Sequence, residues 1–177
     1  MVEKIRRVVT AHDEDGRSVF VIDGDAGTVK EMDSMPGLAL TELWRTDGAP
    51  ADNAGREDAA DGPVVLEPGP GGTVFRIVEF PPDSAWRHRA DARDAFESID
   101  AGHAPDAASD DPMMHKTSTV DYLVVLKGEI WAVLDTGEVC LKAGDVMIQR
   151  GTNHSWSVRA DEPCLLAAVL VNADPVE

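Results

Sequence analysis

Apolar and polar residues alternate along most of the chain, in short segments that are separated by turn residues. The segments are rich in Val, Ile, Leu and Thr, and Gly, Pro, Asp or Asn stand between them. A period of two in many short segments is typical of an all-β sandwich or barrel. The pattern predicts strands at residues 5–10, 18–22, 39–44, 73–80, 120–127, 129–134, 138–141, 145–149, 155–159 and 165–171.

Two glycine-containing turns connect strands in the C-terminal half. Residues 135–137 read Asp-Thr-Gly and residues 142–145 read Lys-Ala-Gly-Asp, so each turn has a glycine where a hairpin needs a positive φ angle. The loops between the last six predicted strands are short. We therefore expect a tight antiparallel meander from Val120 onward.

Two stretches depart from the alternation. Residues 47–72 are rich in Gly, Pro, Ala and Asp, which predicts a long surface loop. Residues 81–114 are polar and interrupted by prolines, except for residues 90–99, which can form a short helix. Such an excursion is more often a lid or a dimer contact than a disordered segment. We expect one domain over residues 1–177, with N-terminal strands at 4–46 and the other barrel half at 113–172.

Composition and charge narrow the classes of function. A chain of 177 residues, 43% of them hydrophobic, can bury the core of one soluble domain. No apolar stretch reaches the roughly 18 to 20 residues of a membrane span, and the N-terminus lacks the apolar segment of a secretory signal. The net charge of −17 disfavours nucleic acid, because phosphates would be repelled.

The two cysteines have no spacing typical of a metal or redox site. Cys140 and Cys164 both lie in apolar strand segments, so we expect buried free thiols and a cytoplasmic location.

The residues that are candidates for metal binding lie between His115 and His154. His115 and Thr117 share one face of a regular strand, Asp121 opens the next strand, and His154 begins a later one. Neighbouring antiparallel strands lie about 4.8 Å apart, so side chains from three of them can converge on one point inside a barrel. The residues therefore indicate a metal site made by His115, Asp121 and His154.

This region resembles the two motifs of the cupin superfamily. His115 takes the first histidine position of the first motif, Asp121 the acidic position, and Gly128 follows at the expected distance. Residues that match the second motif are Gly144, Gly151 and His154. The resemblance implies a double-stranded β-helix, that is, a jelly-roll barrel, with an extra N-terminal strand region and a homodimer formed through N-terminal strands.

The chain also departs from the cupin motifs at four positions. Thr117 stands where the second histidine is expected, and Asp121 replaces a glutamate. Gln149 occupies the proline position of the second motif, and Val158 replaces its asparagine. The resemblance thus implies three protein ligands in place of the usual four.

Residues 8–20, 42–47, 115–122 and 149–156 are similar to a narrower group of small stand-alone cupins. Some of these accompany fungal or bacterial secondary-metabolite pathways as oxidoreductases.

Two histidines and one carboxylate suit one divalent transition metal, Fe, Mn, Ni or Zn, and leave coordination positions free for a substrate or oxygen. We expect a metal-dependent enzyme that acts on a small carbonyl, enol or carboxylate compound. Oxidoreductase or dioxygenase chemistry is favoured over decarboxylation, dehydration or isomerisation. One alternative is a non-catalytic cupin that binds a small molecule or a metal, and another is a metal-free barrel in which both histidines are structural.

Five further residues are candidates to support the ligands or to line a substrate pocket: Thr117, Gln149, Met147, Trp131 and Trp156. His88 and His103 lie in the excursion and can reach the site only if that segment folds over it. No residue stands out as a general base.

Overall fold

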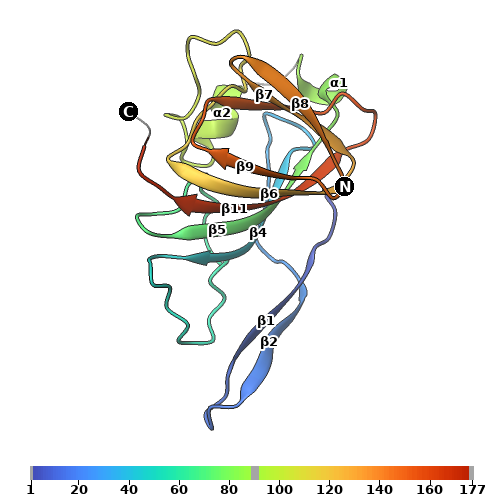
Figure 1. The fold of residues 1–177 in the computed structure, drawn as a ribbon. Helices are drawn as coiled ribbons and strands as arrows, with labels where there is room; N and C mark the ends of the chain where they lie inside the picture. The colour runs from blue at the N-terminus through green and yellow to red at the C-terminus, as the bar shows by residue number, and fades with distance from the viewer. Residues whose placement is uncertain (1, 89–91, 176–177) are drawn as a thin grey trace.

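In the computed structural model, which describes residues 2–88 and 92–175, the chain is an all-β barrel of two facing sheets (Figure 1). All ten predicted strands are found, and the sequence missed only the short strand β3. The larger sheet has the order β3 (Val29–Glu31), β4 (Ala39–Thr46), β5 (Thr73–Phe80), β11 (Cys164–Asn172), β6 (Thr119–Lys127) and β9 (Val146–Arg150). The smaller sheet has the order β10 (His154–Ser157), β7 (Glu129–Leu134) and β8 (Gly137–Lys142).

The expected meander from Val120 onward is wrong. Among the described strands, β6 pairs with β11 and β9, whereas β7 pairs with β8 and β10. The turn at residues 135–137 does close the β7–β8 hairpin, but residues 142–145 carry the chain from one sheet to the other. A glycine turn favours a change of direction, and only the packing of the two sheets decides whether it becomes a hairpin or a corner.

Gly128 forms the corner between β6 and β7. Its φ angle is +75°, and a Cβ atom there would lie 2.8 Å from the carbonyl oxygen of Pro163. The position therefore requires glycine both for its conformation and for the close approach of the segment before β11.

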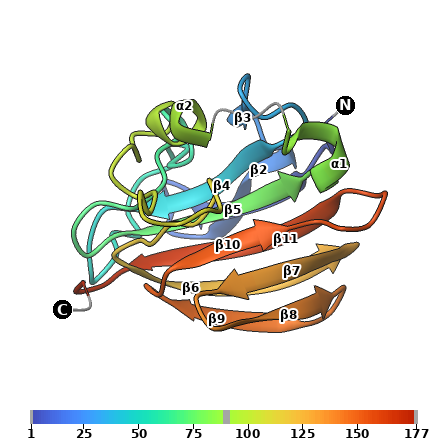
Figure 2. The same cartoon turned by 90° about the horizontal axis from the view of Figure 1, so that it is seen from above.

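Two short helices lie within the excursion after β5. Helix α1 (Asp83–Trp86) and helix α2 (Ala92–Glu97) lie on the β4–β5 side of the barrel, opposite β8 and β9 (Figure 2). The carboxylate of Asp83 accepts hydrogen bonds from the hydroxyl of Ser157 (2.6 Å) and the backbone N–H of Val158 (3.1 Å), which ties α1 to the smaller sheet. Helix α2 falls within the predicted helix at residues 90–99, of which residues 90 and 91 lie outside the described part.

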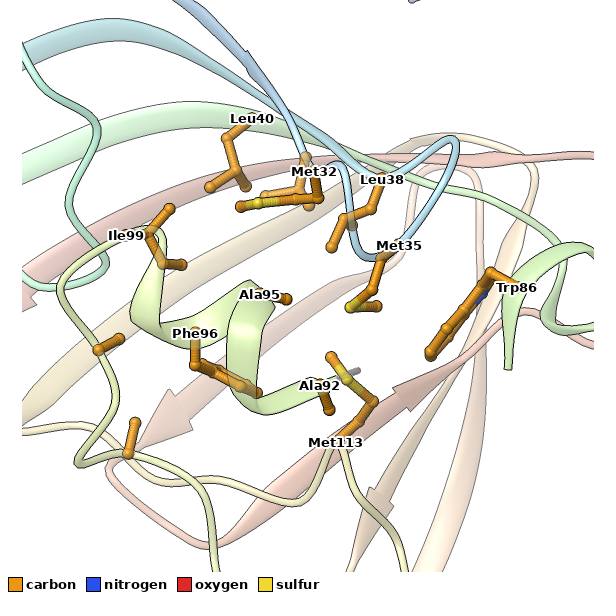
Figure 3. Close-up of a cluster of buried hydrophobic side chains, with 13 residues drawn as sticks. Met32, Met35, Leu38, Leu40, Trp86, Ala92, Ala95, Phe96, Ile99 and Met113 are labelled. Atoms are coloured by element: carbon orange, nitrogen blue, oxygen red, sulfur yellow. The ribbon is translucent and has the colours of Figure 1, made fainter. Parts of the chain in front are cut away.

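The excursion packs against the β4–β5 side of the barrel through a cluster of apolar side chains (Figure 3). The cluster joins α1 and α2 to the segment around β3, which is distant in sequence. Its largest members are Met32, Met35, Leu38, Leu40, Trp86, Phe96, Ile99 and Met113. The excursion is therefore packed onto the barrel, which is compatible with either of the two roles expected for it, a lid or a dimer contact.

None of the helices in residues 2–88 and 92–175 is long and apolar enough to cross a membrane. Both cysteines are free; Cys164 is buried as predicted, but Cys140 is only half-buried. The surface loop predicted at residues 47–72 contains neither helix nor strand.

The N-terminal hairpin, β1 (Arg6–His12) with β2 (Ser18–Asp25), extends away from the barrel (Figure 1). None of residues 2–25 is buried, and Phe20 is 75% exposed. An isolated two-stranded hairpin is at best marginally stable in water. The outer face of β6 and β9 is also apolar and exposed, at Tyr122, Val124 and Ile148.

We expect a homodimer in which a second copy covers these apolar surfaces. Light scattering should give about twice the chain mass of 19.0 kDa. Ile148→Glu should shift the protein towards monomer, because it places a charge on the apolar sheet face. Val139→Glu is the matched control, since Val139 has the same exposure, 51%, but lies on β8 in the other sheet. A wild-type mass equal to one chain would contradict the expectation.

Gly128→Ala should lower the free energy of unfolding by about 2 to 4 kcal/mol, from the left-handed backbone and the contact with Pro163. Chemical denaturation measures this loss. Gly137→Ala is the control, because a Cβ atom at Gly137 meets nothing within 4 Å and its φ angle is not positive. Equal stability of the two variants would show that the corner tolerates a side chain.

Candidate active site

A backbone pairing brings His115 and His154 side by side. The N–H of His115 donates to the carbonyl of His154 at 2.9 Å, and the N–H of His154 donates to the carbonyl of His115 at 2.8 Å. Residues that exchange both hydrogen bonds in an antiparallel pair place their side chains on the same face. The two imidazole rings accordingly lie with their centroids 4.2 Å apart.

The two imidazoles are oriented in the same way. Nδ1 of His115 lies 2.8 Å from the carbonyl oxygen of Met113, and Nδ1 of His154 lies 2.9 Å from that of Thr152. A carbonyl oxygen can only accept a hydrogen bond, so each Nδ1 carries the proton. Each Nε2 is therefore left with a lone pair, which is the arrangement found in metal-ligating histidines.

Both histidines are buried and electrically neutral near pH 7. Burial lowers the pKa of His115, and burial together with the nearby His115 lowers the pKa of His154 to about 3. Neutral imidazoles are the form that binds a metal ion.

The histidines line a cavity of about 110 Å³ inside the barrel. The side chains around it are apolar except for five, namely Arg76, His115, Thr117, Asp121 and His154. Met32, Leu38, Phe96 and Met113 close the cavity from the side of the excursion. The ring of Phe96 lies 4.8 Å from that of His115, so the lid contacts the site directly.

The three predicted metal ligands share this cavity but do not form one cluster. Among the described residues, no three His, Cys, Asp or Glu side chains lie close enough together to hold a metal ion. Two of the predicted ligands, His115 and His154, thus meet, and Asp121 does not complete a three-ligand set with them. The residues present fit a metal bound through two histidine Nε2 atoms, with its other positions open.

Sequence reasoning missed the buried ion pair between Glu42 and Arg76. These residues are direct cross-strand neighbours on β4 and β5, and Nε of Arg76 lies 2.9 Å from Oε1 of Glu42. Burial raises the pKa of Glu42 and lowers that of Arg76, and the opposite charge of the partner counteracts both effects. The available signal was the phase of the alternation, because Arg76 stands in register with the inward residues Val74 and Val78.

Asp121 and Arg76 line the same cavity from strands β6 and β5, which are separated by β11. Desolvation raises the pKa of Asp121 to about 6, although a hydrogen bond from the Thr119 side chain and the charge of Arg76 lower it. The Thr119 hydroxyl also lies 2.7 Å from the hydroxyl of Thr117. A polar strip therefore runs along the wall from Thr117 to Arg76.

The predicted pocket residues divide into two groups. Thr117 and Trp156 line the cavity. Gln149 is buried and faces inward, but its amide donates to Thr152 and is not in the cavity lining. Met147 is half-buried and packs against the edge of a core cluster, outside the cavity lining. The fifth, Trp131, stacks with Arg159 outside the site, with the guanidinium 4.2 Å from the ring centroid.

The two histidines of the excursion do not reach the cavity. His88 is exposed on the surface, and His103 faces Glu67 at 3.4 Å. Neither lines the cavity, so the lid approaches the site through apolar side chains.

Comparison with known proteins agrees with the fold. No protein-family model matches the sequence. Phomopsin biosynthesis cluster protein C' of Diaporthe leptostromiformis is 33% identical over 184 residues, which covers 97% of this chain and 80% of the relative. The cupin-domain-containing oxidoreductase fogC of Aspergillus ruber is 28% identical over 163 residues, or 88% of this chain and 64% of the relative. The chain belongs to the cupin superfamily.

Among solved structures, this cupin is similar to the cupin domain of Cnp3 from Schizosaccharomyces pombe. The TM-score is 0.46 at 12% identity, and the match covers 97% of this chain and 89% of the other.

The buried carboxyl of Asp121 makes the stability of this cupin depend on pH. Its pKa rises from 3.8 to about 6 on folding, which is worth about 3 kcal/mol. The stabilisation is present below pH 4 and is lost as the pH rises through 6, because the folded state holds the proton more tightly than the unfolded state does.

Asp121→Asn removes this dependence. With a chelator present, the free energy of unfolding of the wild type relative to Asp121→Asn should fall by about 2 kcal/mol between pH 4 and pH 7. Denaturation curves at several pH values measure it. A constant difference over this range would show that the carboxyl ionises as freely in the folded protein as in the unfolded chain.

Proposed function

We propose that this cupin is an oxidoreductase that acts on a small organic molecule, with a carbonyl, enol or carboxylate group, inside the barrel. The observation that carries the proposal is the pair of neutral imidazoles, fixed through Nδ1, at the wall of a largely apolar cavity. Relatives named as cupin-domain-containing oxidoreductases support the reaction class.

The proposal includes one divalent transition metal, Fe, Mn, Ni or Zn, held by Nε2 of His115 and of His154. Bound there, the metal would supply Lewis-acid or redox chemistry to the substrate. The carbonyls of Met113 and Thr152 hold the two rings in the orientation that this requires.

The other residues of the cavity would bind the substrate and exclude water. Phe96, Met113 and Trp156 offer apolar walls beside the histidines. A site closed in this way strengthens electrostatic interactions and protects reactive species from water.

Metal analysis of protein purified without a chelator or a histidine tag tests the proposed centre. We expect stoichiometric metal in the wild type, and binding more than about 100-fold weaker in His115→Ala and in His154→Ala, since each removes one of two protein ligands. His12→Ala is the matched control, because His12 is exposed on the N-terminal hairpin and should leave metal binding unchanged. Metal retained in the double variant His115→Ala/His154→Ala would reject this centre.

Turnover distinguishes an enzyme from a binding protein. Oxygen consumption and product formation should be measured with the metal-loaded protein and a panel of enolisable carbonyl compounds. We expect turnover that both histidine substitutions abolish. Tight binding of a compound from the panel without turnover would favour the non-catalytic alternative.

A further inference from the structure

Asp121 occupies the acidic position of the first motif, yet the structure does not group it with the two histidines. Among the described side chains no three-ligand set is formed, although Asp121 and both histidines line the same cavity. Asp121 as a residue is only 6% exposed. A buried carboxylate needs partners, and those of Asp121 indicate a different role.

The partners of Asp121 lie on its own side of the cavity. The side chain of Thr119 hydrogen-bonds to the carboxylate, and the positive charge of Arg76 acts on it from β5. Ala168 is the small inward residue of β11, the strand that separates β5 from β6. Ala168 is the register partner of Arg76 and lines the same cavity as Arg76 and Asp121.

The carboxylate is not saturated by these contacts. Its Oδ1 atom is buried and has no hydrogen-bond partner. A buried acceptor without a donor is costly, and a ligand in the adjoining cavity can supply that donor.

The local charge indicates what kind of ligand fits. Arg76 lies 2.9 Å from Glu42 and also acts on Asp121. Arg45 is a second positive charge, which acts on Glu42. Glu67 is a third carboxylate, which acts on Asp121, so three carboxylates stand against two guanidinium groups. An anionic carboxylate ligand would therefore meet an excess of negative charge, whereas a neutral hydroxyl would meet an acceptor.

The size of the cavity limits the ligand as well. Its volume is about 110 Å³ and its walls are mostly apolar. An apolar protein cavity of about 150 Å³ binds benzene, so this one suits roughly a single small ring.

We propose that Asp121, supported by Arg76 and Thr119, binds the hydroxyl group of an enol or phenol in the barrel cavity and is not a third metal ligand. This inference rests on the proposed function, which names carbonyl, enol and carboxylate compounds as substrates. Of these three classes, only the enol carries a neutral hydroxyl group that can donate a hydrogen bond. The hydroxyl donates to the carboxylate, and the apolar body of the molecule lies against Phe96, Met113 and Trp156.

Calorimetric titration of the metal-free protein with phenol, toluene and benzoate tests the ligand class. The wild type should bind phenol and bind benzoate at least about tenfold more weakly, because benzoate adds a negative charge. Asp121→Leu should lower the ratio of phenol affinity to toluene affinity at least about tenfold, the usual effect of losing a hydrogen bond to a charged group. An equal ratio in both proteins, or no phenol binding by the wild type, would overturn the inference.

Metal titration with Co(II) separates the two roles of Asp121. Asp121→Asn keeps the shape of the side chain, so it should fold where Asp121→Leu does not, and it should also weaken phenol binding. We expect its Co(II) affinity to stay within about threefold of the wild type, with the loss confined to His115→Ala and His154→Ala. A loss of Co(II) affinity in Asp121→Asn as large as in the histidine variants would make Asp121 a ligand. Phenol binding is measured without metal or turnover, so its outcome is independent of whether the protein is an oxidoreductase.

Discussion

The two hydrogen bonds between the backbones of His115 and His154 determine the geometry of the whole site. They join the end of the excursion to the first residue of β10, so they fasten the lid and the smaller sheet at one point. They also place both imidazoles on the cavity side, and the carbonyls two residues before each histidine then set the ring orientation. The chemistry of the site therefore depends on main-chain pairing, which side-chain substitutions around it leave in place.

The cavity is divided into an imidazole side and a carboxylate side. His115 and His154 come from the lid junction and the smaller sheet, whereas Asp121 and Arg76 come from the larger sheet. The carboxylate is held by charge and hydrogen bonding within its own sheet. Under the proposed function, one wall of this small apolar space would hold the ion and the other would recognise a polar group of the substrate.

Much of this architecture could be predicted from local sequence. The alternation of apolar and polar residues predicted all ten longer strands. The motif positions identified His115 and His154, whose side chains lie next to each other in the structure. The strand order could not be obtained in this way, because the glycine turns at residues 135–137 and 142–145 look alike and only one closes a hairpin. The role of Arg76 was missed because a charged residue in a strand is normally assigned to solvent, and its burial depends on Glu42 from another strand.

The position of β11 has a consequence for folding. This strand comes last along the chain but lies between β5 and β6 in the larger sheet. Residues 164–172 must therefore pair with residues 73–80, across most of the barrel sequence, before the sheet is continuous. Contacts between such distant segments slow folding and leave strand edges open in the meantime. A nascent chain can form the β7–β8 hairpin early, but it cannot assemble the cavity until its final strand has been inserted.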